Sequence, residues 1–346
     1  MNILFDKAPG EIYDVFSSLW ILNNYEYAKE EMRQIGVEFN KNYENILLSL
    51  KSNGEIDKNK IERYFQEDLN IAKIFLQLDM WKYNNLNEYL NFLMSLNDNE
   101  IRERIVKAVA DEDENKNDLE EVYASNESIM NYIKHKEINS SLKWEIFCLL
   151  DDRKKYMEDF VGFIKEYSKI SKEVESVRNK EVAEFNLELQ KKLQNFGLEY
   201  LRNITKNIID FEDFENIYIS SSICNLLFIQ VNEKENTCCV LIGTEIKKYL
   251  EKNGGSNTLE NNLKIFKNIS DKTRFSIIKL LLEKDYYGQE IAKVLNITTA
   301  TVSYHMNFLV LTELVHIERK EHKAYYSLNK NVLRNCIKFL NNEFKL

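Results

Sequence analysis

The sequence is poor in the residues that interrupt helices. Its 346 residues include one proline and nine glycines. Proline removes a backbone donor and glycine adds backbone freedom, so both are disfavoured inside helices. Hydrophobic residues make up 44% of the chain, as in ordinary globular proteins. We therefore expect a mainly helical protein whose length allows two or three domains with cores of their own.

Long apolar runs and a disulfide framework are also missing. No stretch approaches the roughly 20 apolar residues of a transmembrane helix. The N-terminus carries acidic residues early and has no basic start followed by an apolar core, so a signal peptide is not expected. The odd number of scattered cysteines excludes a disulfide framework. They are Cys148, Cys224, Cys238, Cys239 and Cys336. These absences predict a cytoplasmic protein with no membrane partner.

The motifs of common enzyme classes are absent too. There is no glycine-rich phosphate loop, no dinucleotide fingerprint and no G-x-S-x-G. Only four histidines are available for acid–base chemistry. An acidic run at residues 111–121 could hold a metal, but it lacks the glycine and the ligand alternation of a calcium loop. A solvated turn is the favoured interpretation. We expect neither an enzyme nor a cofactor.

Charge is distributed unevenly along the chain. The net charge is −9, but residues 259–346 contain 14 Lys and Arg and 9 Asp and Glu, a net of +5. The remaining residues contain 33 basic and 47 acidic side chains, a net of −14. A basic C-terminal module on an acidic body would confine phosphate contacts to one part of the molecule. A chance asymmetry in a lysine-rich chain is the alternative.

Three helices are predicted between residues 270 and 311. Ser270 is a candidate N-cap of the first helix. Its apolar stripe consists of Phe275, Ile278, Leu281 and Leu282. The second helix follows Gly288 and ends at a turn, Asn296–Ile297, and its apolar positions are Ile291, Ala292 and Leu295. Thr298 is expected to cap the third helix, whose inward positions are Val302, Met306 and Leu309.

Two β-rich segments follow the third helix. Val315–Ile317 and Tyr325–Leu328 flank the charged run Glu318–Lys323. This spacing predicts two strands around a charged tip, which is the wing of a winged helix-turn-helix.

Several short motifs in this stretch occur in the same order as in a known family. They are Asp271-Lys272-Thr273-Arg274, Gln289-Glu290-Ile291-Ala292, Thr301-Val302-Ser303-Tyr304-His305-Met306 and Ala324-Tyr325-Tyr326. The stretch resembles the winged helix-turn-helix of ArsR-type transcriptional regulators. The order of a long helical region, a β-hairpin and this module also resembles a larger subset of that family, mostly from bacteria.

The resemblance implies a DNA-binding site on the third helix and the wing. Near the start of such a helix, side chains can reach base edges and backbone N–H groups can meet phosphate. The candidates on the helix are Thr298, Thr299, Thr301, Ser303, Tyr304, His305 and Asn307. On the wing they are Arg319, Lys320 and Lys323. Ordinary solvent exposure is the alternative for each, and Arg274 is at least as well explained by a structural ion pair with Asp271.

Metal sensing, which the resemblance also suggests, is not supported by the residues. Some family members carry Cys-x-Cys ahead of the second helix, where this chain has Asp285-Tyr286-Tyr287-Gly288. Others use histidines and carboxylates on the last helix, but residues 331–344 contain no histidine. Cys238 and Cys239 are adjacent in a predicted strand and would point to opposite faces. We therefore expect no metal site.

The region before the winged module is predicted to be helical with a small sheet. Long amphipathic helices fit residues 156–207, packed on the N-terminal bundle or on a second subunit. Three β-rich segments indicate a small antiparallel sheet with a hairpin: Ile217–Ile219, Leu226–Val231 and Thr237–Ile242. The expected domains are a helical N-terminal domain at 1–253 for ligand sensing, dimerisation or both, a linker at 254–257, and the winged module at 258–346.

Together these expectations describe a dimeric bacterial repressor controlled by a non-metal signal. The helices at 259–269 and 331–344 resemble the family's dimerisation helices. A two-fold dimer would present two recognition helices to a pseudo-palindromic operator in double-stranded DNA, and a small-molecule ligand would act through the N-terminal domain. The alternative is a winged-helix protein-interaction module without sequence-specific DNA binding.

Overall fold

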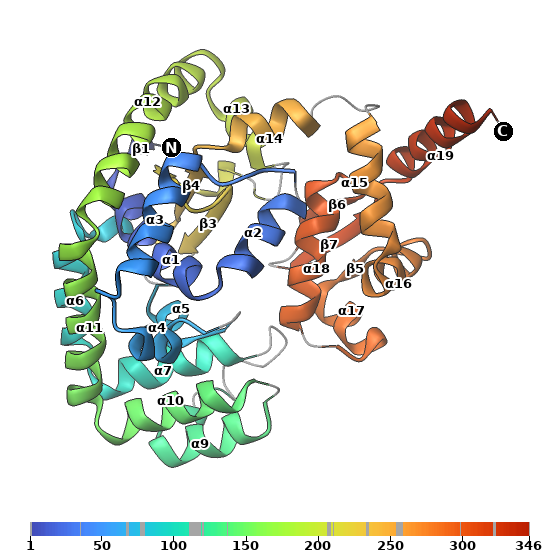
Figure 1. Ribbon diagram of the computed structural model, residues 1–346. Coiled ribbons are helices and arrows are strands. Elements are labelled where there is room, and N and C mark those ends of the chain that lie inside the picture. The colour runs from blue at the N-terminus through green and yellow to red at the C-terminus, as the bar shows by residue number, and fades with distance from the viewer. Residues whose placement is uncertain are drawn as a thin grey trace. The chain divides into compact units, whose positions relative to one another are not determined.

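The computed structural model divides the chain into two compact units (Figure 1). It describes residues 2–34, 36–66, 69–76, 80–110, 119, 121–136, 138–205, 209, 211–232, 235–253, 259–297, 299–320 and 323–345. Unit 1 comprises Met1–Lys29, Phe39–Leu189 and Glu212–Thr244. Unit 2 comprises Glu30–Glu38, Gln190–Phe211 and Glu245–Leu346. Each unit is described by itself below.

The two units do not coincide with a division at the predicted linker. Two segments that precede the predicted linker, Glu30–Glu38 and Gln190–Phe211, group with the C-terminal residues. The linker at 254–257 lies outside the described residues. The domain boundaries therefore stay a prediction.

Unit 1 is built mainly from helices. They are α1 (Ala8–Asn23), α3 (Lys41–Asn53), α4 (Lys58–Tyr64), α5 (Ile71–Leu76), the 3₁₀ turn η1 (Met80–Lys82), α6 (Leu86–Ser95), α7 (Asp98–Val109), α9 (Asn126–Lys134), α10 (Ser140–Asp151) and α11 (Arg153–Ile170). Helix α2 (Tyr25–Gln34) and helix α12 (Lys172–Phe196) each continue across the boundary into unit 2. Polar caps fix several starts; Asn97 and Glu100, for example, form a reciprocal capping box at α7.

The long amphipathic helices predicted at 156–207 are present as α11 and α12, which are separated at Ser171. Helix α11 packs on α6, α10 and α1, so it belongs to the N-terminal bundle. Its buried stripe includes Phe160 and Ile164, as the three- and four-residue spacing predicts. Among the described residues, no helix is long and apolar enough to cross a bilayer.

A four-stranded sheet forms the other part of unit 1. Its strands are β1 (Asn2–Phe5), β2 (Asn216–Ser222), β3 (Leu227–Asn232) and β4 (Thr237–Gly243), in the order β1-β2-β4-β3. The antiparallel hairpin of β3 and β4 confirms the predicted hairpin. The expectation of an all-antiparallel sheet is wrong, because β2 pairs in parallel with both β1 and β4. Every residue of β4 is buried, as is typical of a parallel strand covered on both faces.

Helix α1 approaches strand β2 closely at Gly10. The Gly10 N–H donates to the Ser220 hydroxyl at 2.9 Å. A β-carbon at Gly10 would lie 2.0 Å from the Ser221 carbonyl oxygen, so only glycine allows this approach. Further along α1, the ring of Phe16 packs against the ring of Phe160, with the ring centres 6.3 Å apart. The start of α1 is thereby held against the carboxyl end of β2.

Unit 2 contains the predicted winged helix-turn-helix. Its elements are α13 (Leu198–Thr205), the 3₁₀ turn η2 (Phe211–Asp213, which begins at the unit boundary), α14 (Ile246–Asn253), α15 (Leu259–Ser270), α16 (Lys272–Leu281), β5 (Tyr286–Tyr287), α17 (Gly288–Leu295), α18 (Thr299–Leu311), β6 (Val315–Lys320), β7 (Lys323–Leu328) and α19 (Lys330–Phe344). The wing strands β6 and β7 are antiparallel, as predicted, and β5 adds a third strand in the order β5-β7-β6.

The first helix of the module begins one residue later than predicted, and two of the four residues predicted to face inward are exposed. Ser270 ends α15, and Asp271 is the N-cap of α16, accepting from the Arg274 N–H at 2.8 Å. Ile277, Ile278 and Leu281 are buried in the core, whereas Phe275 and Leu282 are 47% and 50% exposed. Because apolar residues are adjacent in this helix, the sequence does not show which of them face the core. Packing against α17 and α18 determines which ones are buried.

Candidate nucleic-acid interface

The turn of the helix-turn-helix depends on Asn296. This residue ends α17 in the left-handed conformation, with a φ of 53°. Asparagine tolerates that conformation better than most residues with a side chain. The Ile297 N–H then donates to the Ala292 carbonyl at 3.0 Å, which closes the helix end before α18 begins. The predicted turn at Asn296–Ile297 is therefore present.

Helix α18 turns one face inward and leaves a polar face outside. Val302, Met306 and Leu309 are almost fully buried, as predicted. Ser303 and Asn307 are exposed, one helical turn apart. Three further candidates, Thr299, Thr301 and Tyr304, are half-buried. Thr298 lies outside the described residues.

His305 departs from the exposed face predicted for it. Its side chain is only 12% exposed, with Nδ1 lying 3.7 Å from an oxygen of Asp271. The imidazole packs edge-on to Tyr304, with the ring centres 5.1 Å apart. Burial lowers the pKa of His305, and the opposing effect of Asp271 is smaller. The small exposed fraction and these contacts indicate that His305 contributes to packing within the module.

Arg274 is placed as a structural residue. It is buried, and its guanidinium lies 4.9 Å above the ring of Phe308 on α18. Its Nε is 3.9 Å from Asp271. These contacts support the structural interpretation of Arg274 over a role in DNA binding.

The wing brings its basic residues together at one end. In the ladder of β6 and β7, Lys320 is paired with Lys323 and Arg319 with Ala324. The two strands therefore carry three basic residues within two successive backbone pairs at their adjoining ends. Cations so placed suit phosphate contacts, which contribute affinity more than base discrimination.

Helices α15 and α19 expose apolar side chains. Leu259 and Leu263 on α15 are 55% and 53% exposed, and Ile337 and Phe344 on α19 are 59% and 67% exposed. The two helices contact each other, with the rings of Phe266 and Phe339 6.4 Å apart. We call the four exposed residues the α15–α19 apolar surface.

The described part of the chain holds no group of three or more His, Cys, Asp or Glu side chains arranged to bind a metal. Cys336, on the helix where some ArsR-type proteins carry metal ligands, donates to the Asn262 side chain at 3.1 Å. Burial raises the pKa of its thiol to about 11, so the thiolate that metals require is disfavoured. Cys238 and Cys239 are both buried within β4.

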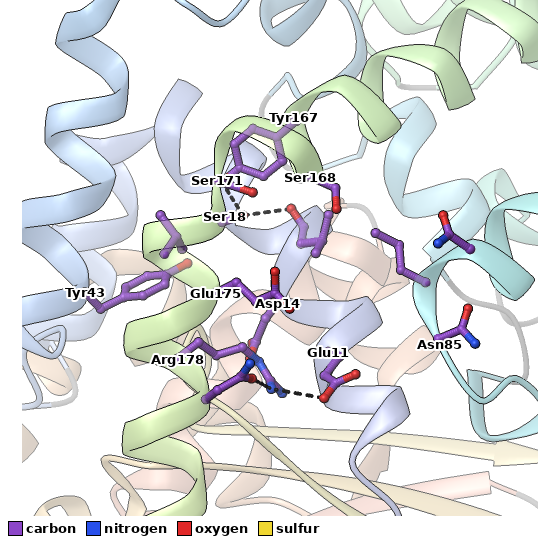
Figure 2. A pocket seen from close by; sticks show the side chains of 15 residues that line it. Glu11, Asp14, Ser18, Tyr43, Asn85, Tyr167, Ser168, Ser171, Glu175 and Arg178 are labelled. Atoms are coloured by element: carbon purple, nitrogen blue, oxygen red, sulfur yellow. Dashed lines mark hydrogen bonds and ion pairs between the residues drawn. The ribbon is translucent and has the colours of Figure 1, made fainter.

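A second candidate site, not predicted from the sequence, is a cavity of about 230 Å³ within unit 1 (Figure 2). Its walls come from α1, α3, α11 and α12 and from the start of α6. Charged groups in it include Glu11, Asp14, Glu175 and Arg178. These residues are scattered between positions 11 and 178, so no local motif could have revealed them.

Comparisons with known proteins agree on the winged module. Residues 271–316 match the model of the bacterial regulatory protein arsR family. The Transcriptional repressor SdpR of Bacillus subtilis (strain 168) is 40% identical over 78 residues, which is 22% of this chain and 87% of that protein. HlyU from Vibrio cholerae N16961 is a structural neighbour at 19% identity, covering 25% of this chain and 94% of that one, and its TM-score of 0.21 supports no further conclusion.

The recognition helix, its turn and the wing define a winged helix-turn-helix protein. The chain belongs to the arsR family of bacterial regulatory proteins. It is accordingly a regulatory protein and not an enzyme. Because the SdpR similarity spans 78 residues, the greater part of the chain lies outside it.

Proposed function

We propose that this protein is a sequence-specific, DNA-binding transcriptional repressor that acts as a homodimer in the cytoplasm. The observation that carries the proposal is the division of α18 into two faces. Val302, Met306 and Leu309 anchor the helix, which leaves Ser303 and Asn307 directed outward. Serine hydroxyls and asparagine amides are suited to the donor and acceptor groups of the major groove.

Phosphate contacts would come from the wing and from the start of α18. Arg319, Lys320 and Lys323 lie at the adjoining ends of the two wing strands. The first backbone N–H groups of α18, near Thr299, would meet a phosphate at the positive end of the helix dipole. Thr301 and Tyr304 would add contacts at the edge of the helix, and Thr298 and His305 stay predicted contacts. Repression is proposed from the similarity to a repressor.

The α15–α19 apolar surface is the proposed dimer interface. Four large apolar side chains, each more than half exposed, would be covered by the same residues of a second copy. A two-fold dimer brings two recognition helices to successive half-sites, so the operator would be pseudo-palindromic. The interface would be isologous, which means that both protomers would contribute the same residues of α15 and α19 to it.

We assign signal reception to the N-terminal region. The predicted domains are this region at residues 1–253, a linker at 254–257 and the DNA-binding domain at 258–346. The absence of thiolate and histidine ligands from the positions used by metal-sensing relatives favours a non-metal signal. The cavity of unit 1 is a second observation in favour, because it offers a concave site for a small molecule.

A gel-shift titration against the DNA upstream of its own gene tests the proposal. The double variant Ser303→Ala/Asn307→Ala removes the two exposed polar groups of α18 and is expected to weaken specific binding by at least about tenfold. Asn45→Ala/Ser49→Ala is the matched control, since these exposed residues have the same spacing on α3 of unit 1. Equal binding by both double variants would contradict the assignment of the recognition face.

The second candidate function is a winged-helix protein-interaction module. The exposed apolar side chains of α15 and α19 favour it, because they would also suit a different protein. If the module binds protein and not specific DNA, its DNA affinity should not depend on the exposed residues of α18. The two double variants would then bind DNA equally, which distinguishes this function from the first.

A further inference from the structure

One wall of the cavity in unit 1 is formed by a buried ion pair between Arg178 and Asp14. The Nε of Arg178 donates to an oxygen of Asp14 at 2.7 Å, and its Nη2 donates to the Ser221 carbonyl at 3.2 Å. Asp14 also accepts from the Ile223 N–H at 3.1 Å and from the Ser222 hydroxyl. Both charged side chains are about 95% buried and satisfied by these partners. This pair fixes α1, α12 and the end of β2 and leaves little capacity for a ligand.

Two further carboxylates at the cavity are not neutralised in this way. Glu11 lies 3.8 Å from Arg178 and 3.7 Å from Lys7, both longer than a hydrogen bond. Among the described residues, the Glu175 side chain has no hydrogen-bond or ion-pair partner. With Asp14 and Arg178 cancelling each other, the lining carries a surplus of two negative charges. Figure 2 shows Glu11 and Glu175 on either side of this pair.

The two tyrosines of the lining are buried, and their hydroxyl groups already have partners. The Tyr167 hydroxyl donates to Ser18 at 2.7 Å, and Ser18 in turn donates to the Val15 carbonyl at 2.8 Å. The Tyr43 hydroxyl is 2.9 Å from the Cys224 sulfur. With these groups occupied and both side chains only 1% exposed, neither tyrosine offers a free ring face to a ligand. The apolar part of a ligand would instead contact Val15, Leu86 and Val174 of the lining.

We propose that this cavity binds a small organic amine in its protonated form. The ammonium group would pair with Glu175 and Glu11, and a compact apolar body would contact Val15, Leu86 and Val174. A cavity of about 150 Å³ is known to accept benzene, so about 230 Å³ accommodates a ring with a short chain, roughly ten non-hydrogen atoms. The amine's role as the regulatory signal rests on the proposed function, whereas its binding does not.

Titration calorimetry on the full chain tests whether the cavity prefers a positively charged ligand. The probes are 2-phenylethylamine and hexane-1,6-diamine as amines, 2-phenylethanol as the neutral analogue and 3-phenylpropanoate as the anion. At least one amine is expected to bind with a Kd of about 1 mM or tighter, and at least about tenfold more tightly than the neutral and anionic analogues. Equal or tighter binding of the alcohol or the carboxylate overturns the proposal, and so does the failure of both amines.

A matched pair of variants on α12 locates the site. Glu175→Gln is expected to weaken amine binding by about tenfold. Glu173→Gln, an exposed residue of the same turn that does not line the cavity, is expected to leave it unchanged. Circular dichroism of both variants checks that each is folded. If the two variants bind the amine alike, the amine does not bind at Glu175, and the proposed site is wrong.

Parallel DNA-binding measurements keep the two proposals apart. An amine that binds while the protein shows no specific DNA affinity would support the cavity assignment and count against the proposed function. Specific DNA binding in a protein that binds neither amine would do the reverse. Helix α12 continues from the cavity wall into the chain of unit 2, so an occupied cavity is expected to change DNA affinity when both proposals hold.

Discussion

Unit 1 and the winged module of unit 2 carry their candidate sites in opposite ways. In unit 1 the site is a concave pocket: Asp14 and Arg178 are buried, paired and satisfied, and the pocket lies beside them. In the winged module the site is an outer face, since α18 exposes Ser303 and Asn307 and the apolar side chains of α15 and α19 remain uncovered. A concave pocket suits a small molecule, and an exposed face suits macromolecules.

The largest effect should come from breaking the buried ion pair of unit 1. Asp14→Ala leaves Arg178 charged and buried, and we expect it to lower the free energy of unfolding by about 3–5 kcal/mol. Glu30→Ala is the control, because Glu30 pairs with Lys267 across an exposed 3.3 Å contact within unit 2. The control should lose far less stability, because an exposed ion pair contributes little. Urea denaturation measures the free energy of unfolding of both variants. Similar decreases would mean that the buried ion pair contributes no more to stability than the exposed one.

The next largest effect concerns the apolar surface of the winged module. Ile337→Asp places a charge in the proposed dimer interface and should weaken dimerisation by at least about 100-fold. Trp144→Asp is the control, because Trp144 on α10 of unit 1 is 61% exposed, comparable to Ile337 at 59%. Sedimentation equilibrium measures both. A wild-type monomer, or equal dissociation of both variants, would show that this surface has another use.

A smaller effect is expected at the turn before the recognition helix. Asn296→Val puts a β-branched side chain at a φ of 53° and should destabilise the module by about 1–2 kcal/mol. Asn296→Gly, which tolerates this conformation, should change stability by less. Thermal unfolding of the two variants gives the difference. If valine is tolerated as well as glycine, the left-handed turn does not limit the stability of the module.

The smallest effect is a pH dependence from His305. Because burial lowers its pKa in the folded state, the unfolded chain binds a proton first as pH falls below about 6.5. Its contribution to stability is therefore complete above that pH and declines below it. His305→Gln should reduce the slope of stability between about pH 6.5 and 5. An unchanged slope would mean that His305 titrates alike in both states.

Local patterns made the winged module predictable. The spacing of Val302, Met306 and Leu309 predicts the buried face of α18, and Asn296 predicts the turn, because each depends on residues within a few positions. In the predicted stripe of α16, Ile278 and Leu281 are buried, but the prediction is wrong for Phe275 and Leu282. All four residues are hydrophobic, so hydrophobicity alone does not distinguish them. Strand β5 was missed because its two tyrosines form no pattern of their own.

Contacts between distant residues explain what the sequence did not reveal in unit 1. Strand β1 pairs in parallel with β2, which begins more than 200 residues later, and nothing in Asn2–Phe5 indicates that partner. The buried run of β4 was a signal for a parallel strand, but β2 and β4 were assumed to be antiparallel. The cavity combines single residues of five helices, and only packing brings Asp14 beside Arg178.

The most direct test of the account is the salt dependence of DNA binding by the full chain. Fluorescence anisotropy would compare a duplex from upstream of its own gene with a scrambled duplex of equal length. We predict at least about 1000-fold tighter binding to the first duplex. Its affinity should also fall steeply between 50 and 200 mM salt, roughly 10³-fold or more, as phosphate contacts release counterions. Equal affinity for both duplexes, or an affinity unchanged by salt, would contradict a sequence-specific DNA-binding function.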